Sequence, residues 1–399
     1  MNIVTAKSNR GFTLVEMLVA LALGMIVLAS AVQIFTQGVD ATWVTSQRAE
    51  MQQDLRATSD LLLKDISLAG AGLPHGQGIQ LPTNTGTRPI YGCDQANNCP
   101  PNGAVAYPCA SNAGPCVPTL FGIIPGFQLG IKPAGSNTTS DIVTVAYTDS
   151  TFALPCYTVT FPGGGAVNPV TFTAPNAPPP SSCVLPPGLV FPQSITNSVV
   201  GLKAGDLLLF QNTLNGATGQ AIAEVSNAAG PVNGGANSVF TVNFLNGDPL
   251  KLNQSGAASG DLVNILKGAG TTATRIFVIT YYLRTQADPV GVGPGTPVLM
   301  RQVNGQPAVP LAENVVNFQF TYDTYNANGQ LLNQVGDAGY SVGTSFNLIR
   351  KINVLHLTTR SQLPGTRSAL MATRGYQTFD FQTSISARNL SYQNRYTFQ

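Results

Sequence analysis

The sequence predicts an α+β fold in which a long N-terminal helix packs on a mainly antiparallel β domain with long disulfide-pinned loops. Three observations predict it. The chain begins with an apolar run that contains no proline. Its middle is rich in Pro, Gly and Cys. Its second half consists of short β-branched or aromatic segments separated by turn residues. Because no segment of helical period lies between those short segments, we expect antiparallel strands.

The composition is poor in charge and rich in turn residues. Only 10% of the 399 residues are charged, against about 25% in an average soluble protein, while 41 residues are Gly and 28 are Pro. This profile favours a turn-rich β protein outside the cytoplasm over a cytosolic enzyme. The net charge of +2 indicates no particular class of partner.

The N-terminal region predicts a single membrane-spanning helix. The first eleven residues are polar and include Lys7 and Arg10, and no charged residue occurs from Met17 to Val39. Roughly 20 helical residues cross the hydrocarbon core, and basic residues before such a helix stay cytoplasmic. We therefore expect residues 12–39 to be the transmembrane part of the helix.

Two ordinary interpretations of this segment compete with a third. A cleaved signal peptide has an apolar core of about 7–15 residues before its cleavage site. The run here is longer, although "LASAVQIF" offers such a site near Ala31. A plain single-pass anchor leaves Glu16 unexplained, because a carboxylate inside a membrane helix costs about 2.5–3.5 kcal/mol on insertion scales.

The third interpretation begins with the stretch "RGFTLVEMLVALAL". It resembles the class III signal of type IV prepilins and pseudopilins, in which a basic leader ends in Gly and is followed by Phe and, at the fifth mature position, Glu. The resemblance implies that residues 1–11 are a leader, that prepilin peptidase cleaves between Gly11 and Phe12, and that Phe12 becomes N-methylphenylalanine. We expect Glu16 to pair with the new amino terminus of another subunit, because either charge buried alone costs several kcal/mol. Such a pair would set the register of assembly.

The helix is expected to continue outside the membrane as residues 40–72. No proline occurs from Phe12 to Gly70, which predicts a rod of about 58 residues and about 87 Å. Spacings of three and four predict one buried stripe: Met51, Leu55, Thr58, Leu62, Ile66 and Ala69. Most charged residues are expected off that stripe: Asp54, Arg56, Asp60, Lys64 and Asp65. The glycines and Pro74 of "AGAGLP" end the helix.

Residues 73–194 are expected to form a Pro/Gly/Cys-rich loop region with few strands, of which 140–149 is the clearest. All six cysteines lie here, and their spacings do not match the ligand pairs of zinc sites. An even number of cysteines in such loops indicates disulfides formed in an oxidising compartment. We expect neighbours to pair, as Cys93–Cys99, Cys109–Cys116 and Cys156–Cys183; buried reduced thiols are the alternative.

Residues 195–399 are expected to form a β-rich pilin-like globular domain, because strand signals recur throughout. "PVLMRQVNGQPAVPLAENVVNFQFTYDTY" and "QTFDFQTSISARN" resemble the C-terminal half of PilW-type minor pilins and of the related J-type minor pseudopilins of type II secretion. "QRAEMQQDLRATSDLLLKDISLAG" resembles the helix of the same proteins. The resemblance is close over the first 74 residues and looser over about residues 275–390.

The resemblance implies a PilW-like minor pilin that acts in type IV pilus assembly and priming. Such a protein crosses the inner membrane once, holds its C-terminal domain in the periplasm, and joins the extracellular pilus after assembly. Its expected partners are prepilin peptidase, other minor pilins, the major pilin and inner-membrane lipid. One alternative is a J-type minor pseudopilin of a type II secretion system. An alternative of another class is a pilus-displayed adhesion module in residues 75–192.

Other patterns favour structure over chemistry, so we expect no enzymatic activity, cofactor or metal. "GYSVG" matches a hydrolase nucleophile elbow at Ser341, but Asp380 and His356 follow in the wrong order, and His75 is the other histidine of the chain. "DTYNANG" (323–329) lacks the closing glutamate of a calcium loop and favours a hairpin turn.

The basic residues after Ser341 are scattered, which favours pairing with acids or neighbouring subunits over DNA binding. They are Arg350, Lys351, Arg360, Arg367, Arg374, Arg388 and Arg395. Nucleic acid is therefore not an expected partner.

Overall fold

The structure is a computed structural model of the chain. It describes residues 12–74, 79–81, 96, 119–134, 136–162, 168–174, 183, 194–214, 217–231, 238–250, 252–253, 270–287, 295–325, 330–335, 348–361, 376–387 and 389–390. The chain divides into two compact units. One comprises Met1–Gln53 and Ser361–Gln377, and the other comprises Asp54–Arg360 and Thr378–Gln399.

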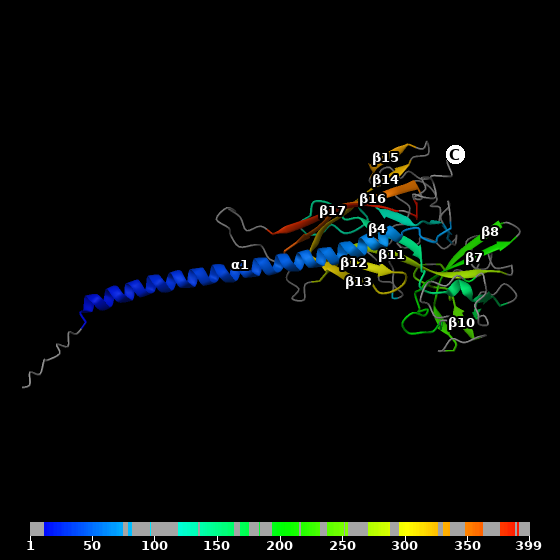
Figure 1. The fold of residues 1–399 in the computed structure, drawn as a ribbon, viewed down its shortest axis with the longest axis horizontal. Helices are drawn as coiled ribbons and strands as arrows, with labels where there is room; N and C mark the ends of the chain where they lie inside the picture. Colours follow the sequence, from blue (N-terminus) through cyan, green and yellow to red (C-terminus); the bar gives the residue numbers. More distant parts are fainter. Residues whose placement is uncertain are drawn as a thin grey trace, which may run out of the picture. The chain divides into compact units, whose positions relative to one another are not determined.

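The predicted N-terminal helix is helix α1, Leu14–Leu68, which runs for 55 residues (Figure 1). At 1.5 Å per residue it is about 83 Å long. Past its end, Gly70 and Gly72 adopt φ angles of +77° and +68°, which favour glycine. A Cβ atom at Gly72 would also collide with the hydroxyl of Thr148, so the glycine-rich stop is required by both conformation and space.

The C-terminal part of α1 carries the buried stripe that the sequence predicts, with one correction. Leu55, Leu62 and Ile66 are buried, and so are Thr58 and Ser59. Asp65, which was expected off the stripe, is only 1% exposed. Its position three residues after Leu62 places it on the stripe, and side chains from distant strands compensate its charge, as described below.

The β domain follows the helix, and the two together confirm the predicted fold class. Every strand pair in the described part of the chain is antiparallel. The central sheet contains β3 (Ile123–Gly126), β4 (Ile142–Thr148), β7 (Leu207–Leu214), β8 (Ala217–Glu224), β11 (Thr272–Gln286), β12 (Thr296–Val303) and β13 (Val309–Glu313).

Two four-stranded sheets accompany the central sheet. The C-terminal sheet has the order β15 (Leu331–Val335), β14 (Val315–Tyr325), β16 (Ile349–Arg360) and β17 (Thr378–Ser386). The small sheet has the order β5 (Thr158–Thr160), β6 (Val170–Thr173), β10 (Val239–Asn243) and β9 (Asn227–Ala229). The remaining elements are β1 (Ile79–Gln80), which pairs with β2 (Thr119–Leu120), and the short helix η1 (Leu154–Cys156).

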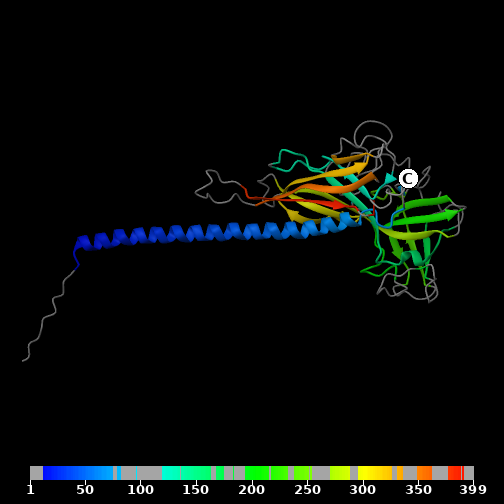
Figure 2. The same cartoon turned by 45° about the horizontal axis from the view of Figure 1, so that its top comes forward.

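The β domain has two hydrophobic cores. The first core joins the end of α1 to the central and C-terminal sheets, and the second core lies around the small sheet. In both views β7, β8 and β10, drawn in green, lie apart from β14 and β16, drawn in yellow to orange (Figure 1, Figure 2).

Strand β7 forms a wall between the two cores. Leu207 and Leu209 belong to the first core, whereas Leu208 and Phe210 belong to the second. Because a strand points successive side chains to opposite faces, β7 must be apolar on both faces. This explains the uninterrupted run "LLLF" at the start of the strand.

The small sheet draws its strands from both sides of the predicted boundary at residues 194/195. β6 pairs with β10 along Val170↔Val242 to Thr173↔Val239, although about 65 residues separate the two strands in sequence. The predicted boundary therefore does not coincide with a division between sheets. Strands β5 and β6 are not among the predicted strands, although "YTVTF" and "VTFT" show a short alternation.

Candidate processing and assembly site

The start of α1 carries the residues that the sequence predicts to function. Gly11 lies outside the described residues, so the predicted cleavage after it remains a prediction. Phe12 is 87% exposed and precedes the helix. Glu16 lies in the first turn of α1.

Thr13 and Glu16 form a reciprocal cap on the helix. The backbone N–H and the hydroxyl of Thr13 both donate to Glu16 Oε2, at 2.9 and 3.0 Å. The backbone N–H of Glu16 in turn donates to the Thr13 hydroxyl, at 3.3 Å. This is the capping-box arrangement, in which a Thr before the helix and a Glu three residues later satisfy each other's N–H groups.

The cap explains why the helix begins at Leu14 rather than at Phe12, and it gives Glu16 a local role beyond the predicted pairing with another subunit. The signal was available, because Thr-x-x-Glu before an apolar run is the sequence signature of a capping box. A negative charge in the first turn is also favoured by the helix dipole. Both hydrogen bonds from Thr13 to Glu16 end on Oε2, so among the described residues Oε1 of Glu16 has no donor and is available to a cation.

The helix that follows Glu16 presents an exposed apolar surface that no described residue buries. α1 contains one stretch that is long and uncharged enough to cross a membrane, and none of that stretch is buried. Leu18, Ile26 and Phe35, for example, are each more than half exposed. An apolar surface of this size requires lipid or other helices around it, because water penalises its exposure.

The far end of α1 is fixed to the central sheet by a buried polar network. Asp65 accepts hydrogen bonds from the hydroxyls of Tyr147 at 3.2 Å and Tyr281 at 2.6 Å, and from Arg301 Nε at 2.8 Å. Burial, followed by the charge of Asp65, raises the pKa of both tyrosine hydroxyls. Burial alone would lower the pKa of Arg301, but the hydrogen bond and charge of Asp65 raise it above its ordinary value.

A second buried ion pair fixes the second core to β11. Arg275 Nε donates to Asp149 at 2.7 Å, and Nη1 donates to the carbonyls of Val200 and Gly201. The guanidinium also lies over the ring of Phe152 at 5.0 Å. These contacts satisfy a charge that would otherwise be costly to bury.

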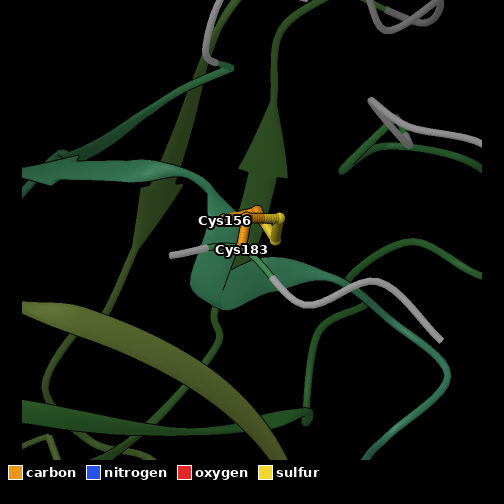
Figure 3. Close-up of a disulfide and its surroundings, with 2 residues drawn as sticks. All are labelled: Cys156 and Cys183. Carbon is orange, nitrogen blue, oxygen red and sulfur yellow. A yellow bond between two sulfur atoms is a disulfide. The ribbon is translucent and has the colours of Figure 1, made fainter. Parts of the chain in front are cut away.

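The disulfide expected between Cys156 and Cys183 is present (Figure 3). Cys156 is buried at the end of η1, beside the second core. The other four cysteines, Cys93, Cys99, Cys109 and Cys116, lie outside the described residues, so their pairing remains a prediction.

The hydrolase pattern does not gain a site from the structure. Ser341 and His75 lie outside the described residues. His356 lies on β16, where Nδ1 is 2.9 Å from Asp380 Oδ2, and Thr358 donates to the same carboxylate at 2.6 Å. Although desolvation raises the pKa of Asp380, hydrogen bonds from Thr358, Gln382 and His356 hold it below its ordinary value.

The described residues of the calcium pattern and of the basic set have structural partners. Asp323 accepts from Asn353 at 3.0 Å and lies 3.9 Å from Lys351, while β14 and β15, which flank 326–329, are antiparallel neighbours. Arg350 donates to the carbonyl of Leu390, and Arg360 donates to that of Ala134. The other basic residues of the set, Arg367, Arg374, Arg388 and Arg395, lie outside the described residues.

Comparisons with known proteins match only part of the chain. The family described as the prokaryotic N-terminal methylation motif matches residues 6–32. Pilin-like protein PilA3 of Thermus thermophilus is 40% identical over 63 residues, which are 16% of this chain and 27% of that protein. The chain thus spans only 27% of the length of this relative. No solved structure matches the chain. The chain carries the N-terminal methylation motif of type IV pilin-like proteins.

Proposed function

We propose that the chain is a PilW-like minor pilin that assembles into the type IV pilus and helps to prime it. Prepilin peptidase cleaves it between Gly11 and Phe12 and methylates Phe12. Residues 12–39 hold it in the inner membrane with its C-terminal domain in the periplasm, until α1 enters the filament among other minor pilins and the major pilin. The role is assembly and not catalysis.

The observation that carries this proposal is the position of Glu16. It lies in the first turn of a helix whose apolar stretch is not buried, it belongs to the methylation motif, and its Oε1 accepts no hydrogen bond from a described residue. Cleavage after Gly11 would create a cationic amino group on Phe12. The charge of Glu16 on one subunit and the amino terminus of another would then neutralise each other inside a helix bundle, where neither could be left alone.

Maturation is tested by intact mass and N-terminal sequencing of protein isolated from membranes. We expect a chain that begins at Phe12 and carries one extra methyl group. A Gly11→Val variant, which puts a branched side chain at the predicted cleavage site, should still begin at Met1. A wild-type chain that begins at Met1, or near Ala31, would contradict the proposal.

The assembly role of Glu16 can be separated from its capping role. Glu16→Gln keeps a side chain that can accept the Thr13 hydrogen bonds, because Gln also serves in a capping box, but it removes the charge. We expect this variant to insert and mature normally and to enter filaments several-fold less often than wild type. Normal entry into filaments, measured by immunoblotting of sheared pili, would exclude the ion pair.

Deletion separates the pilus from the type II secretion machine. We expect loss of surface pili with normal protein secretion when the gene is deleted. Lost secretion with normal piliation would instead assign the chain to the J-type minor pseudopilins.

The second core favours one further candidate function, adhesion at the pilus surface. No residue of α1 belongs to the second core, which the Cys156–Cys183 disulfide stabilises. This core is therefore not needed to pack the helix. Deleting residues 75–192 would be uninformative, because it would remove β3 and β4 of the central sheet. Exposed residues outside both cores, Val199 and Leu245, offer a milder test. Lost attachment with normal piliation in Val199→Ser/Leu245→Ser would support adhesion, and normal attachment would oppose it.

A further inference from the structure

We propose that the C-terminal sheet continues from one copy of this chain into a second copy, with the free edge of β17 in one copy paired antiparallel to the free edge of β15 in the other. The inference deepens the proposed function by naming the neighbour that the β domain meets in an assembly. It rests on that function only for the shared orientation of the assembled subunits. The four strands of the sheet lie within one compact unit, which comprises Asp54–Arg360 and Thr378–Gln399.

The edge strands of the central and small sheets have features that prevent pairing with a further strand. In the central sheet, β3 contains Pro125 and β13 contains Pro310, and a proline has no N–H to donate to a neighbour. Edge strand β8 is covered at Glu224, whose N–H donates to Asn253 Oδ1 at 2.8 Å and whose carbonyl accepts from Asn253 Nδ2 at 2.6 Å. In the small sheet, the edge strands β5 and β9 have only three residues each.

The C-terminal sheet differs, because neither of its edge strands contains proline. Among the described residues, β17 pairs with β16 alone and β15 pairs with β14 alone. β17 has nine residues and β15 has five. Both strands expose apolar side chains: Phe379 is 42% exposed, Leu331 48% and Leu332 36%. An exposed edge without a blocking residue is a template for a further strand.

The backbone of β17 presents a row of hydrogen-bonding groups to its free edge. On either side of the strand, the carbonyl of Gln377 accepts from the N–H of Ser361 at 2.8 Å, and the N–H of Ala387 donates to the carbonyl of Arg350 at 3.3 Å. The odd-numbered residues of β17 therefore bond to β16, and alternation directs the N–H and C=O groups of the even-numbered residues to the free edge. These residues, all exposed, are Thr378, Asp380, Gln382, Ser384 and Ser386.

Strand direction identifies the edge that fits β17. In the order β15–β14–β16–β17 each strand is antiparallel to the next, so β15 and β17 run in opposite directions (Figure 1). A second copy placed beside the first in the same orientation therefore brings its β15 antiparallel to β17. Two β17 strands in that orientation would be parallel, and in register Asp380 would lie beside Asp380, which like charges disfavour.

The side chains of the two edges are compatible. Phe381 packs against the first core, and alternation places Phe379 on the same face of β17. Leu332 of β15 pairs with the buried Thr324, so it lies on the core face of its own strand. Pairing would bring Leu332 of one copy beside the two phenylalanines of the other, and aromatic and aliphatic residues are favourable cross-strand neighbours. Asp380 is the sole charged residue in either strand, so no like charges meet.

Amide hydrogen exchange tests the contact at the edge itself. The full chain in detergent micelles is compared at low and high protein concentration, and exchange is measured residue by residue by mass spectrometry. We expect the amides of Asp380, Gln382 and Ser384 to exchange more slowly at high concentration, because a second strand would accept their hydrogen bonds. The amides of Phe379 and Phe381, which already face β16, should not change. Association without slower exchange of the first three amides would overturn the proposal.

Two variants close one edge each. Gln382→Pro removes an N–H from the free edge of β17 without removing a bond to β16, and Gln382→Ala, which keeps the N–H, is its control. Leu332→Lys places a charge on the core face of β15 at its edge, and Leu332→Met is its control. In sedimentation velocity we expect wild type and both controls to associate as concentration rises, and each closed variant to stay monomeric. Near-UV circular dichroism checks the fold, and Ser384→Pro replaces Gln382→Pro if that variant does not fold.

An equimolar mixture of the two closed variants identifies the partner edge. One variant keeps an open β15 and the other keeps an open β17, so we expect the mixture to form a one-to-one dimer that neither variant forms alone. A monomeric mixture, or association of Leu332→Lys by itself, would overturn the pairing of β17 with β15. Wild type that stays monomeric but begins at a methylated Phe12 would refute this inference alone, whereas a chain that begins at Met1 and associates would refute the proposed function alone.

Discussion

At the scale of single residues, Thr13 determines where the helix begins. Its hydroxyl and N–H meet Glu16 in a reciprocal cap, so Glu16 is satisfied in the isolated subunit before any partner arrives. An apolar helix can therefore carry this carboxylate without leaving it unpaired, since the cap lies at the end of the helix and satisfies Oε2 locally.

Removing the cap should loosen the first turn. In Thr13→Val the hydroxyl is lost, and capping residues of this kind are worth about 1 kcal/mol. We expect amide hydrogen exchange of Glu16 and Met17, whose N–H groups donate to the hydroxyl and the carbonyl of Thr13, to accelerate about fivefold in detergent micelles, which is what that free energy corresponds to. Thr13→Ser, which keeps the hydroxyl, is the control and should exchange like wild type. Equal exchange in the valine variant would show that the cap is not stabilising.

Two buried tyrosines make the β domain sensitive to alkali. Burial and the charge of Asp65 raise the pKa of Tyr147 and Tyr281 in the folded protein, so the folded state holds these protons more tightly than the unfolded chain. Their contribution is fully present below the ordinary tyrosine pKa of about 10 and is lost as the pH rises above it.

We therefore expect the free energy of unfolding to be flat between about pH 8 and 9 and to fall above about pH 10, by up to about 1.4 kcal/mol per pH unit for each tyrosine. Urea unfolding of the full chain in detergent, followed by near-UV circular dichroism, measures this. Tyr281→Phe should reduce the slope. A slope that Tyr281→Phe leaves unchanged would mean that other groups cause the alkaline loss.

At the scale of elements, the last three turns of α1 are held by both apolar packing and charge. Leu62 and Ile66 are fully buried, while Asp65 between them contacts β4, β11 and β12 through Tyr147, Tyr281 and Arg301. A single carboxylate thus ties the helix to three strands of the central sheet. This contact specifies the rotation of the helix about its axis more sharply than apolar packing alone can.

Breaking this contact should cost much of the stability of the β domain. Asp65→Asn leaves Arg301 without its anion, and removing one partner of a buried pair typically costs about 3 kcal/mol or more. We expect a clear fall in the midpoint of urea unfolding. Asp60→Asn, on the exposed face of the same helix, is the matched control and should stay within about 0.5 kcal/mol of wild type. Similar losses in both variants would argue against a special role for Asp65.

At the scale of the whole molecule, the β domain divides its burial between two cores that share β7 and β11. The first core includes Ile276 and the second includes Ala273, so neighbouring parts of β11 serve different cores. Only the second core carries the disulfide that the structure describes, which spans a sequence separation of 27 residues. The two cores should therefore respond differently when the disulfide is removed.

Cys156→Ser/Cys183→Ser should destabilise the second core by about 3–4 kcal/mol, the loop-closure entropy for a loop of this length. In this variant we expect amide protection in β6 and β10 to disappear at lower urea concentrations than protection in β14 and β16. In wild type the two pairs of strands should lose protection at more similar urea concentrations. Loss of protection in all four strands at the same urea concentration would show that the two cores unfold as one.

The sequence by itself determined the features that depend on residues close to one another in the chain. These are the helix from its lack of proline and its spacing of three and four, its glycine stop, the methylation motif, and the strands with clear alternation. Such features follow from backbone geometry and side-chain periodicity, which a short window contains.

Only the tertiary structure decided the features whose partners are far away in sequence. The sequence predicts Asp65 to be a surface charge, whereas in the folded protein it binds Tyr281 and Arg301. The run at the start of β7 did not reveal that it faces two cores, and nothing near β6 indicated that β10 would be its neighbour. Pairing and burial of this kind are set by the competition among distant segments for the same contacts, so the physical information is absent from any single stretch of the chain.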